Sequence, residues 1–274
     1  DKLNDQINQP AQISDDSYVA MAGLGKDDIV NKIYDELSKK FNDIPITISE
    51  IDPTDILAFA YLFKILDFEE KFDSFESEMT FKNKHVKIKS FGIKYQEFDK
   101  LKKQVKLLYI DTYENFIIEL KTKSLTDEII ISNITCEATL LLTYNKIQEK
   151  IILSKNEKKH NSELDSEEKP EDFETLSIPK INFFIKHKFN EIINQNIKNI
   201  NFTAYNIKNA IQIIKFTLND KGVTIESSDE LTISLGKSPP KLEIKGPFVI
   251  YLKNKNSTFP YFMAYIGNED LLEK

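Results

Sequence analysis

The sequence predicts an α+β fold with several largely antiparallel sheets, peripheral helices and one long exposed loop. Runs rich in β-branched and aromatic residues recur along the 274 residues, which is typical of strands. Near the N-terminus, apolar residues at four-residue steps indicate an amphipathic helix. Close to the C-terminus, the long polar segment 222–247 separates two strand-like runs, and loops of that length are usually functional.

Composition excludes several classes of protein. Hydrophobic residues make up 41% of the chain and aromatic residues 11%, so the chain can bury a sizeable core. Its net charge of −7 gives no electrostatic footprint for nucleic acid, so a nucleic-acid partner is not expected. No run approaches the length of a membrane span. The single cysteine, Cys136, excludes an internal disulfide.

Residues 1–26 are polar and are predicted to form a linker. The run 23–26, Gly-Leu-Gly-Lys, resembles half of a phosphate loop but lacks its spacing and its trailing Ser or Thr. A globular domain is therefore expected over residues 27–274. It opens with a helix that begins at Asp27-Asp28 and has one apolar stripe formed by Ile29, Ile33 and Leu37.

The middle of the chain reads mainly as strands. Residues 56–63 contain no polar side chain and predict a central strand buried on both faces. Residues 79–95 alternate between apolar and lysine side chains, and residues 105–110 and 116–120 predict two further strands joined by a turn. The run that starts at Ser124 resembles the capped beginning of a short helix that extends through Ile131.

The last third contains a charged insertion and a second set of strands. Residues 154–174 are rich in Glu, Lys, Asp and Ser, so a disordered insertion is expected there. A strand is predicted over 176–181, a helix near Phe189, and a short helix over 207–211 before a strand over 213–218. No change in composition divides the chain into two domains.

In this order, several runs resemble the serpins, the family of serine protease inhibitors and their non-inhibitory relatives. Leu-Ser-Ile-Pro-Lys at 176–180 is similar to the family's LHLPKF strand, and residues 215–222 are similar to the KAFVEVNEEG run that leads to the reactive loop. Residues 247–252 and 260–263 resemble the closing PFLFLI and ILFMG strands. The loop length also matches, since Gly222 and Pro247 are 25 positions apart (247 − 222), as in antitrypsin-like members.

The resemblance extends from about residue 27 to residue 268, and it implies a serpin-like fold with a reactive loop at 222–247. Two departures accompany it. The family places several helices and strands before the helix that residues 29–34 resemble, so that portion is expected to be absent or to be a separate N-terminal fragment. The family's tryptophan near Lys64 is missing, and Phe68 is the nearest aromatic substitute. The resemblance favours a secreted protein.

Serpin inhibitors act as suicide substrates: the protease cleaves the loop, and the freed half inserts as a strand into the large sheet. Rapid insertion requires small residues in the hinge, because bulk and charge slow entry into a packed sheet. The hinge here contains none of the expected alanines; it consists of Gly222, Val223, Thr224, Ile225 and Glu226. Residues 223–234 do alternate apolar and polar side chains, as an inserting strand should, except for the carboxylate of Asp229.

Family spacing places the scissile bond between Gly236 and Lys237. Shifted registers would place it between Leu235 and Gly236, which suits a protease pocket for apolar side chains, or between Lys237 and Ser238, which suits a trypsin-like protease. The sequence does not choose among these three.

The sequence thus predicts a non-inhibitory serpin-fold protein that binds a protein partner and is not an enzyme. One alternative is a suicide inhibitor of a serine or cysteine protease. Another is a structural subunit that completes its sheet with a partner fragment. No cofactor is expected, and no metal, because the three histidines, His85, His160 and His187, are far apart and lack the acidic or Cys spacing of a metal site. No nucleophile elbow or Gly-rich oxyanion turn supports a Ser-His-Asp set.

Overall fold

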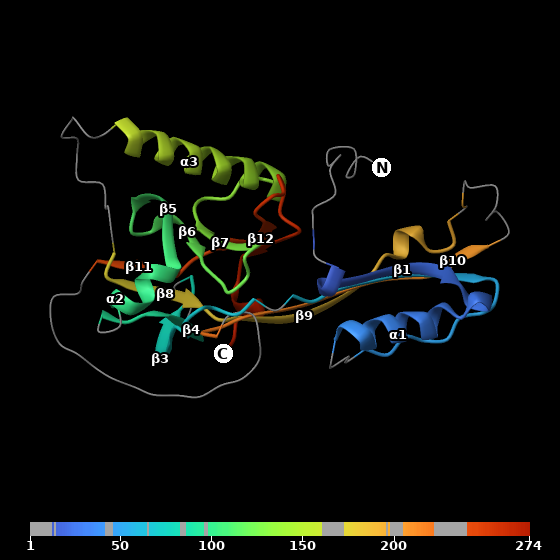
Figure 1. Ribbon diagram of the computed structural model, residues 1–274. Helices are drawn as coiled ribbons and strands as arrows, with labels where there is room; N and C mark the ends of the chain where they lie inside the picture. Colours follow the sequence, from blue (N-terminus) through green and yellow to red (C-terminus); the bar gives the residue numbers. More distant parts are fainter. Residues whose placement is uncertain are drawn as a thin grey trace. The chain divides into compact units, whose positions relative to one another are not determined.

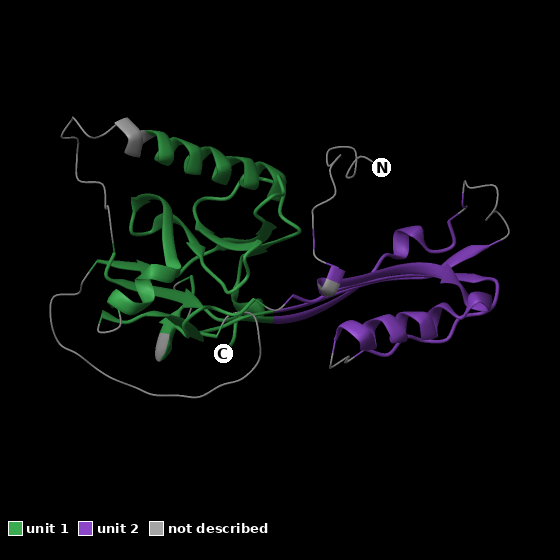
Figure 2. Ribbon diagram, viewed as in Figure 1, with its two compact units in different colours: residues 1–12, 65–182, 217–274 green, residues 13–64, 183–216 purple. Residues whose placement is uncertain are grey.

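The structure, a computed structural model, describes residues 13, 15–41, 46–64, 66–82, 86–95, 98–160, 173–195, 197, 205–221 and 240–274. The chain divides into two compact units (Figure 2). Unit 1 comprises residues 1–12, 65–182 and 217–274, and unit 2 comprises residues 13–64 and 183–216. Two of the boundaries fall inside strands, β9 (Ile181–Lys188) and β10 (Asn206–Leu218), where composition does not change. That is why the sequence shows no transition there.

Unit 2 is built on a sheet with strand order β1-β2-β10-β9. Strand β2 (Asp55–Leu62) is central, as predicted, with β1 (Tyr18–Leu24) antiparallel on one side and β10 parallel on the other. The predicted linker over 1–26 is therefore wrong for Tyr18–Leu24, since this strand pairs with β2 along its whole length. Two short 3-10 turns, Asp15–Ser17 and Gly25–Asp27, flank β1.

Helix α1 (Ile29–Lys40) covers one face of this sheet (Figure 1). The predicted stripe is confirmed, because Ile29, Ile33 and Leu37 are buried in a cluster with the odd-numbered residues of β2 and with β10. The helix ends after two lysines, where the Phe41 amide donates a hydrogen bond to the Leu37 carbonyl oxygen. The even-numbered residues of β2 are only half-buried, so the expected burial on both faces holds for one face alone.

Unit 1 contains two sheets, the first with strand order β11-β8-β4-β3. Its strands are β3 (Asp73–Thr80), β4 (Lys87–Ile93), β8 (Thr175–Pro179) and β11 (Lys241–Glu243). The predicted alternation is present at the start of β4, where Ile88 is buried between the exposed Lys87 and Lys89. From Ser90 onward β4 is buried on both faces.

The second sheet has strand order β13-β12-β7-β6-β5, and its neighbouring strands are antiparallel. Its strands are β5 (Val105–Thr112), β6 (Asn115–Leu120), β7 (Asp127–Asn133), β12 (Phe248–Asn254) and β13 (Phe262–Ile266). The predicted hairpin of β5 and β6 and the two C-terminal strands are confirmed. Among the strand pairings with a described register, β10–β2 and β11–β8 are the parallel ones, so the predicted largely antiparallel architecture is confirmed.

The helix predicted from Ser124 through Ile131 is wrong, because this segment leads into strand β7. The Ser124 hydroxyl accepts a hydrogen bond from the Asp127 amide (3.0 Å) and donates one to the Asp127 carboxylate (2.7 Å). A helix cap would use the same kind of hydrogen bond, but here it forms a turn before the β-branched run 129–131. That run then pairs with β6 and β12 on both sides.

Helix α3 (Leu140–His160) covers a face of the second sheet, and the sequence did not predict it. Apolar residues lie all around this helix and give no clear stripe, which explains the omission. The helix begins before the predicted insertion. Its last residues, 154–160, fall within the insertion and are helical, contrary to the prediction for 154–174. Residues 161–172 of that insertion lie outside the described residues.

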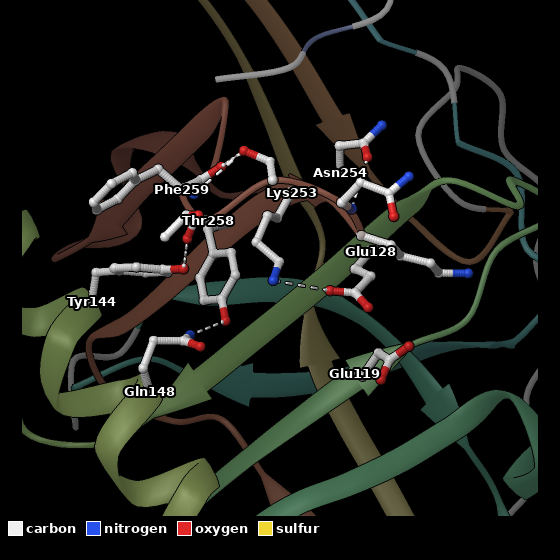
Figure 3. A network of polar contacts seen from close by, with 12 residues as sticks. Glu119, Glu128, Tyr144, Gln148, Lys253, Asn254, Thr258 and Phe259 are labelled. Atoms are coloured by element: carbon white, nitrogen blue, oxygen red, sulfur yellow. Dashed lines mark hydrogen bonds and ion pairs between the residues drawn. The ribbon is translucent and has the colours of Figure 1, made fainter. Parts of the chain in front are cut away.

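Polar contacts fasten α3 to strand β12 and to the turn that follows it (Figure 3). The Tyr144 hydroxyl donates to the Thr258 carbonyl oxygen (2.6 Å), and the Gln148 amide donates to the Tyr251 hydroxyl (3.0 Å). Burial raises the pKa of Tyr251 well above its ordinary range, and nearby Tyr144 raises it further. The Tyr251 phenol is therefore a neutral structural group of the core.

The helix predicted over 207–211 is also wrong, since these residues belong to the 13-residue strand β10. Pairing with β2 decides the outcome, with a register shift between Ile207 and Asn209. The predicted helix near Phe189 is reduced to the 3-10 turn Asn190–Ile192 after β9. The remaining short elements are α2 (Phe98–Leu101), the 3-10 turn Lys102–Gln104 and the 3-10 turn Glu269–Leu271.

Candidate functional site

The candidate site is the base of the long loop, in unit 1. Strand β10 ends at Leu218, a turn follows, and the chain is described again from Pro240, just before β11. The predicted hinge and scissile residues all lie outside the described residues; they are Gly222, Val223, Thr224, Ile225, Glu226, Leu235, Gly236, Lys237 and Ser238. The structure therefore describes how the two ends of the loop are held.

The turn after β10 is buried. Asn219 is 6% exposed and Asp220 is 3% exposed, although both are polar. The Asn219 side-chain oxygen accepts a hydrogen bond from the Lys221 amide (2.9 Å), which is the contact of an Asx turn. This local contact reverses the chain at the position where the sequence predicts the strand to break.

Asp220 is the centre of a buried charge cluster. One carboxylate oxygen lies 2.8 Å from the Lys180 ammonium nitrogen, and the other lies 3.1 Å from that of Lys71. Lys180 is itself buried and also donates a hydrogen bond to the Ser74 hydroxyl (2.8 Å). A buried carboxylate is stable only when it is paired and hydrogen-bonded in this way.

The charge state of Asp220 follows from these contacts. Burial by itself raises the pKa of the carboxyl, but the hydrogen bonds from Lys180 and Lys71 outweigh that effect. The net result is a pKa below the ordinary value, so Asp220 is ionised at neutral pH. Both of its oxygens are occupied by lysines, and the group is therefore suited to hold the loop base and not to act as a general base.

Backbone contacts fix the same turn from the other side. The Phe72 amide donates to the Asp220 carbonyl oxygen (2.8 Å), and the Phe68 amide donates to the Lys221 carbonyl oxygen (3.0 Å). The two rings form an edge-to-face pair with centroids 4.7 Å apart, and Phe91 packs against both. Phe68, the residue expected to replace the missing tryptophan, is thus a buried part of the loop base.

The far end of the loop is attached to strand β8. The Pro240 carbonyl oxygen accepts hydrogen bonds from the Glu174 amide (2.8 Å) and the Thr175 amide (3.2 Å). Strand β11 then pairs in parallel with β8, with Leu242 fully buried. Both ends of the loop are therefore held by core elements of unit 1.

Metal binding finds little support in the described residues. They contain no group of three or more His, Cys, Asp or Glu side chains that could hold a metal ion. His187 is exposed and forms an edge-to-face pair with Phe189, with ring centroids 4.5 Å apart, while the side chains of His85 and His160 lie outside the described residues. No helix among the described residues is long and apolar enough to span a membrane.

Sequence reasoning missed the partners of Asp220. Lys180 belongs to the strand that resembles the family, and Asp220 belongs to the predicted turn, but nothing in the sequence links two residues that are 40 positions apart (220 − 180). The usable signal was a polar pair, Asn219-Asp220, placed directly after a buried apolar strand. Such a pair must find partners in the fold.

No protein-family model matches the chain, and no curated protein matches it either. Solved structures do match. A serpin from the trematode Schistosoma haematobium is 13% identical with a TM-score of 0.51, over 87% of this chain and 62% of the other. A serpin from Schistosoma mansoni is also 13% identical, with a TM-score of 0.50 and the same coverage. Serpin48 from the insect Tenebrio molitor is 14% identical with a TM-score of 0.47.

The likeness to the two trematode serpins shows the fold. The chain has a serpin-like α+β fold, as the sequence predicted, in which a long segment connects β10 with β11. The chain spans less than two thirds of the length of these structures, 62% of the two trematode serpins and 65% of Serpin48.

Proposed function

We propose that this chain is a non-inhibitory serpin-fold protein that binds a protein partner, with the segment 222–239 displayed as a loop; the rest of the predicted loop, from Pro240 to Pro247, contains strand β11, which is paired with β8. The observation that carries the proposal is the hinge sequence, where Val223, Ile225 and Glu226 stand in place of small residues. Each of these side chains would have to enter a packed sheet if the loop inserted, and overpacking costs about 1–3 kcal/mol per site.

The sheet that would receive the loop shows where an inserted strand would have to enter. Strand β10, which leads into the loop, has β2 on one side and β9 on the other. An inserted strand next to β10 must therefore separate an existing pairing, such as the one with β2 that runs from Asn206↔Asp55 to Ile214↔Leu62. Asp229 would also carry a carboxylate toward the apolar face of such a strand.

A panel of serine and cysteine proteases tests the proposal. Each protease is incubated with the protein and the products are separated by SDS gel electrophoresis. We expect cleavage products and no SDS-stable complex. A matched variant in which Ile225 and Glu226 are replaced by alanine shows whether the hinge is the obstacle. An SDS-stable complex with the unmodified protein would instead establish the suicide inhibitor, with cleavage near Gly236-Lys237.

A second candidate, the subunit that completes its fold with a partner fragment, is favoured by a group of small side chains on the face of the unit 2 sheet opposite α1. On the face opposite α1, Ala20 of β1 lies beside Ala60 of β2, and Ala22 lies beside Ala58, so the four alanines are neighbours. Ala20 and Ala22 are exposed, whereas Ala58 and Ala60 are half-buried. Small side chains allow another backbone to approach closely.

Native mass spectrometry of the protein purified from its source tests this candidate. A stoichiometric polypeptide that dissociates only on unfolding would support it, and a bare chain that unfolds cooperatively would refute it. Exchange of Ala20 for arginine should release such a polypeptide, whereas exchange of the exposed Lys32 on α1 should not.

A further inference from the structure

A second site lies in unit 1, in a cleft of about 780 Å³. Its walls are β11 with the turn after it, the turn between β5 and β6, the end of β7 with the residues that follow it, and Lys82 and Tyr265. Ligand sites have volumes of roughly 300–1,000 Å³, so the cleft is large enough for several side chains of a partner. It adjoins the far end of the loop base at β11 and shares no residue with the Asp220 charge cluster.

The β11 wall carries excess positive charge. Lys241 lies 2.9 Å from the Glu243 carboxylate, and Lys245 pairs with the same carboxylate. Burial alone raises the pKa of Glu243, but the hydrogen bonds from Lys241 and Lys245 hold it below its ordinary value. Glu243 is therefore ionised, and its single charge is shared by two lysines.

Lys82 adds a further cation. Its backbone is left-handed (φ 54°), a conformation that side-chain-bearing residues rarely adopt, and its amide donates a hydrogen bond to the Lys245 carbonyl oxygen (2.7 Å). Its side chain is exposed and makes no ion pair with any residue that the structure describes. The charged residues of the lining are Lys82, Lys241, Lys245, Glu114 and Glu243, which sum to +1 in a chain of net charge −7.

The cleft also offers aromatic surface and free space. Tyr113 and Tyr265 line it and are 37% and 46% exposed. At Gly246, a Cβ atom would have no neighbour within 4 Å, so the backbone borders open space. Tyrosines are enriched at protein-binding surfaces, where the ring supplies contact area and the hydroxyl a hydrogen bond.

We propose that this cleft binds an acidic stretch of a partner protein, with its carboxylates at Lys82 and the β11 lysines and an apolar residue against the tyrosines. A peptide suits this cleft because several separate segments of the chain line it together, next to the exposed end of the loop at Pro240. The inference rests on the proposed function in one respect, namely that the partner is a protein. The proposed contacts are made by residues outside the displayed segment 222–239.

Fluorescence anisotropy tests the proposal with the full chain. The probe is a fluorescein-labelled octapeptide of glutamates with two central leucines, and the control probe has glutamine in place of every glutamate. We expect the acidic probe to bind, and to bind more weakly as salt is raised, because screening weakens exposed ion pairs. Lys82→Ala should weaken binding about two- to fivefold, the upper part of the range for an exposed ion pair.

Two further variants make the test specific. Gly246→Leu should fill the open space and weaken binding at least as much as Lys82→Ala, with unchanged circular dichroism. Lys123→Ala removes an exposed lysine that does not line the cleft and should have no effect. Equal binding of the two probes, equal effects of Lys82→Ala and Lys123→Ala, or no binding of the acidic probe at millimolar concentration would overturn the proposal. A protease-panel result that refutes the proposed function leaves these outcomes unchanged.

Discussion

Exchange of Asp220 for asparagine tests how the loop base is held. The substitution keeps the side-chain size and removes the charge that neutralises Lys180, whose side chain is 8% exposed. Removing one partner of a buried ion pair costs about 3–5 kcal/mol, because the other charge stays buried without compensation. We expect about 3 kcal/mol, the lower end, because Lys180 keeps its hydrogen bond to Ser74 and because Lys71 is 47% exposed.

Urea denaturation followed by circular dichroism measures this loss of unfolding free energy. Two variants serve as controls. Lys71→Ala removes the half-exposed partner and should cost less than about 1 kcal/mol. Adding Lys180→Met to Asp220→Asn removes the buried charge and should recover at least about 1 kcal/mol. A cost of Asp220→Asn below about 0.5 kcal/mol, or additive effects in the double variant, would refute the reasoning.

The same carboxylate gives the stability a predicted pH dependence. Because the folded pKa of Asp220 lies below the ordinary value of 3.8, its ion pairs are fully present above that value. Their contribution is lost as the pH falls through the folded pKa. The stability difference between wild type and Asp220→Asn should therefore be constant from about pH 7 to about pH 5 and shrink below the ordinary value. A difference that disappears near pH 6 would contradict the assignment.

Three other predictions concern the core. Ile33→Ala on α1 should cost about 2–5 kcal/mol in urea denaturation, since Ile33 is fully buried, whereas Lys32→Ala should be near neutral. Gly92→Ala should lower the melting temperature sharply, because its φ is 158° and a Cβ would lie 1.9 Å from the Leu176 carbonyl oxygen; Gly246→Ala should not. In an alkaline titration at 295 nm, Tyr251→Phe should leave the tyrosine absorbance change near pH 10 unaltered, since burial raises the pKa of Tyr251 above that of exposed tyrosines.

Elements with a clear local pattern were predictable from the sequence. The four-residue steps of α1 and the two apolar runs on either side of the β5–β6 turn are local signals, and the structure confirms both elements. The turn at Asn219 was also predictable, because its hydrogen bond to the Lys221 amide is local.

Elements decided by tertiary contacts were not predictable. The cap-like contact of Ser124 and Asp127 fits a helix start as well as a turn, and pairing of β7 with two neighbours selects the strand. Likewise, residues 207–211 are extended because β10 pairs with β2. The division into two units cuts through β9 and β10, where no loop composition could mark it.

The candidate site was only partly predictable. The sequence placed the start of the loop near Gly222, and the described chain does leave β10 through a turn at Asp220 and Lys221. It could not show that Lys180 and Lys71 hold Asp220, since these residues belong to separate elements. It also gave no sign of the cleft, because Lys82, Tyr113 and Lys245 converge only in the folded chain.

The thermal stability of the loop-cleaved protein tests the central proposal most directly. The purified protein is cut within segment 222–239 by limited proteolysis, the cut is located by mass spectrometry, and intact and cleaved samples are compared by differential scanning calorimetry. A non-inhibitory loop that stays outside the sheet predicts melting temperatures within a few degrees of each other. A large rise after cleavage would show that the loop inserts, and would contradict the proposal.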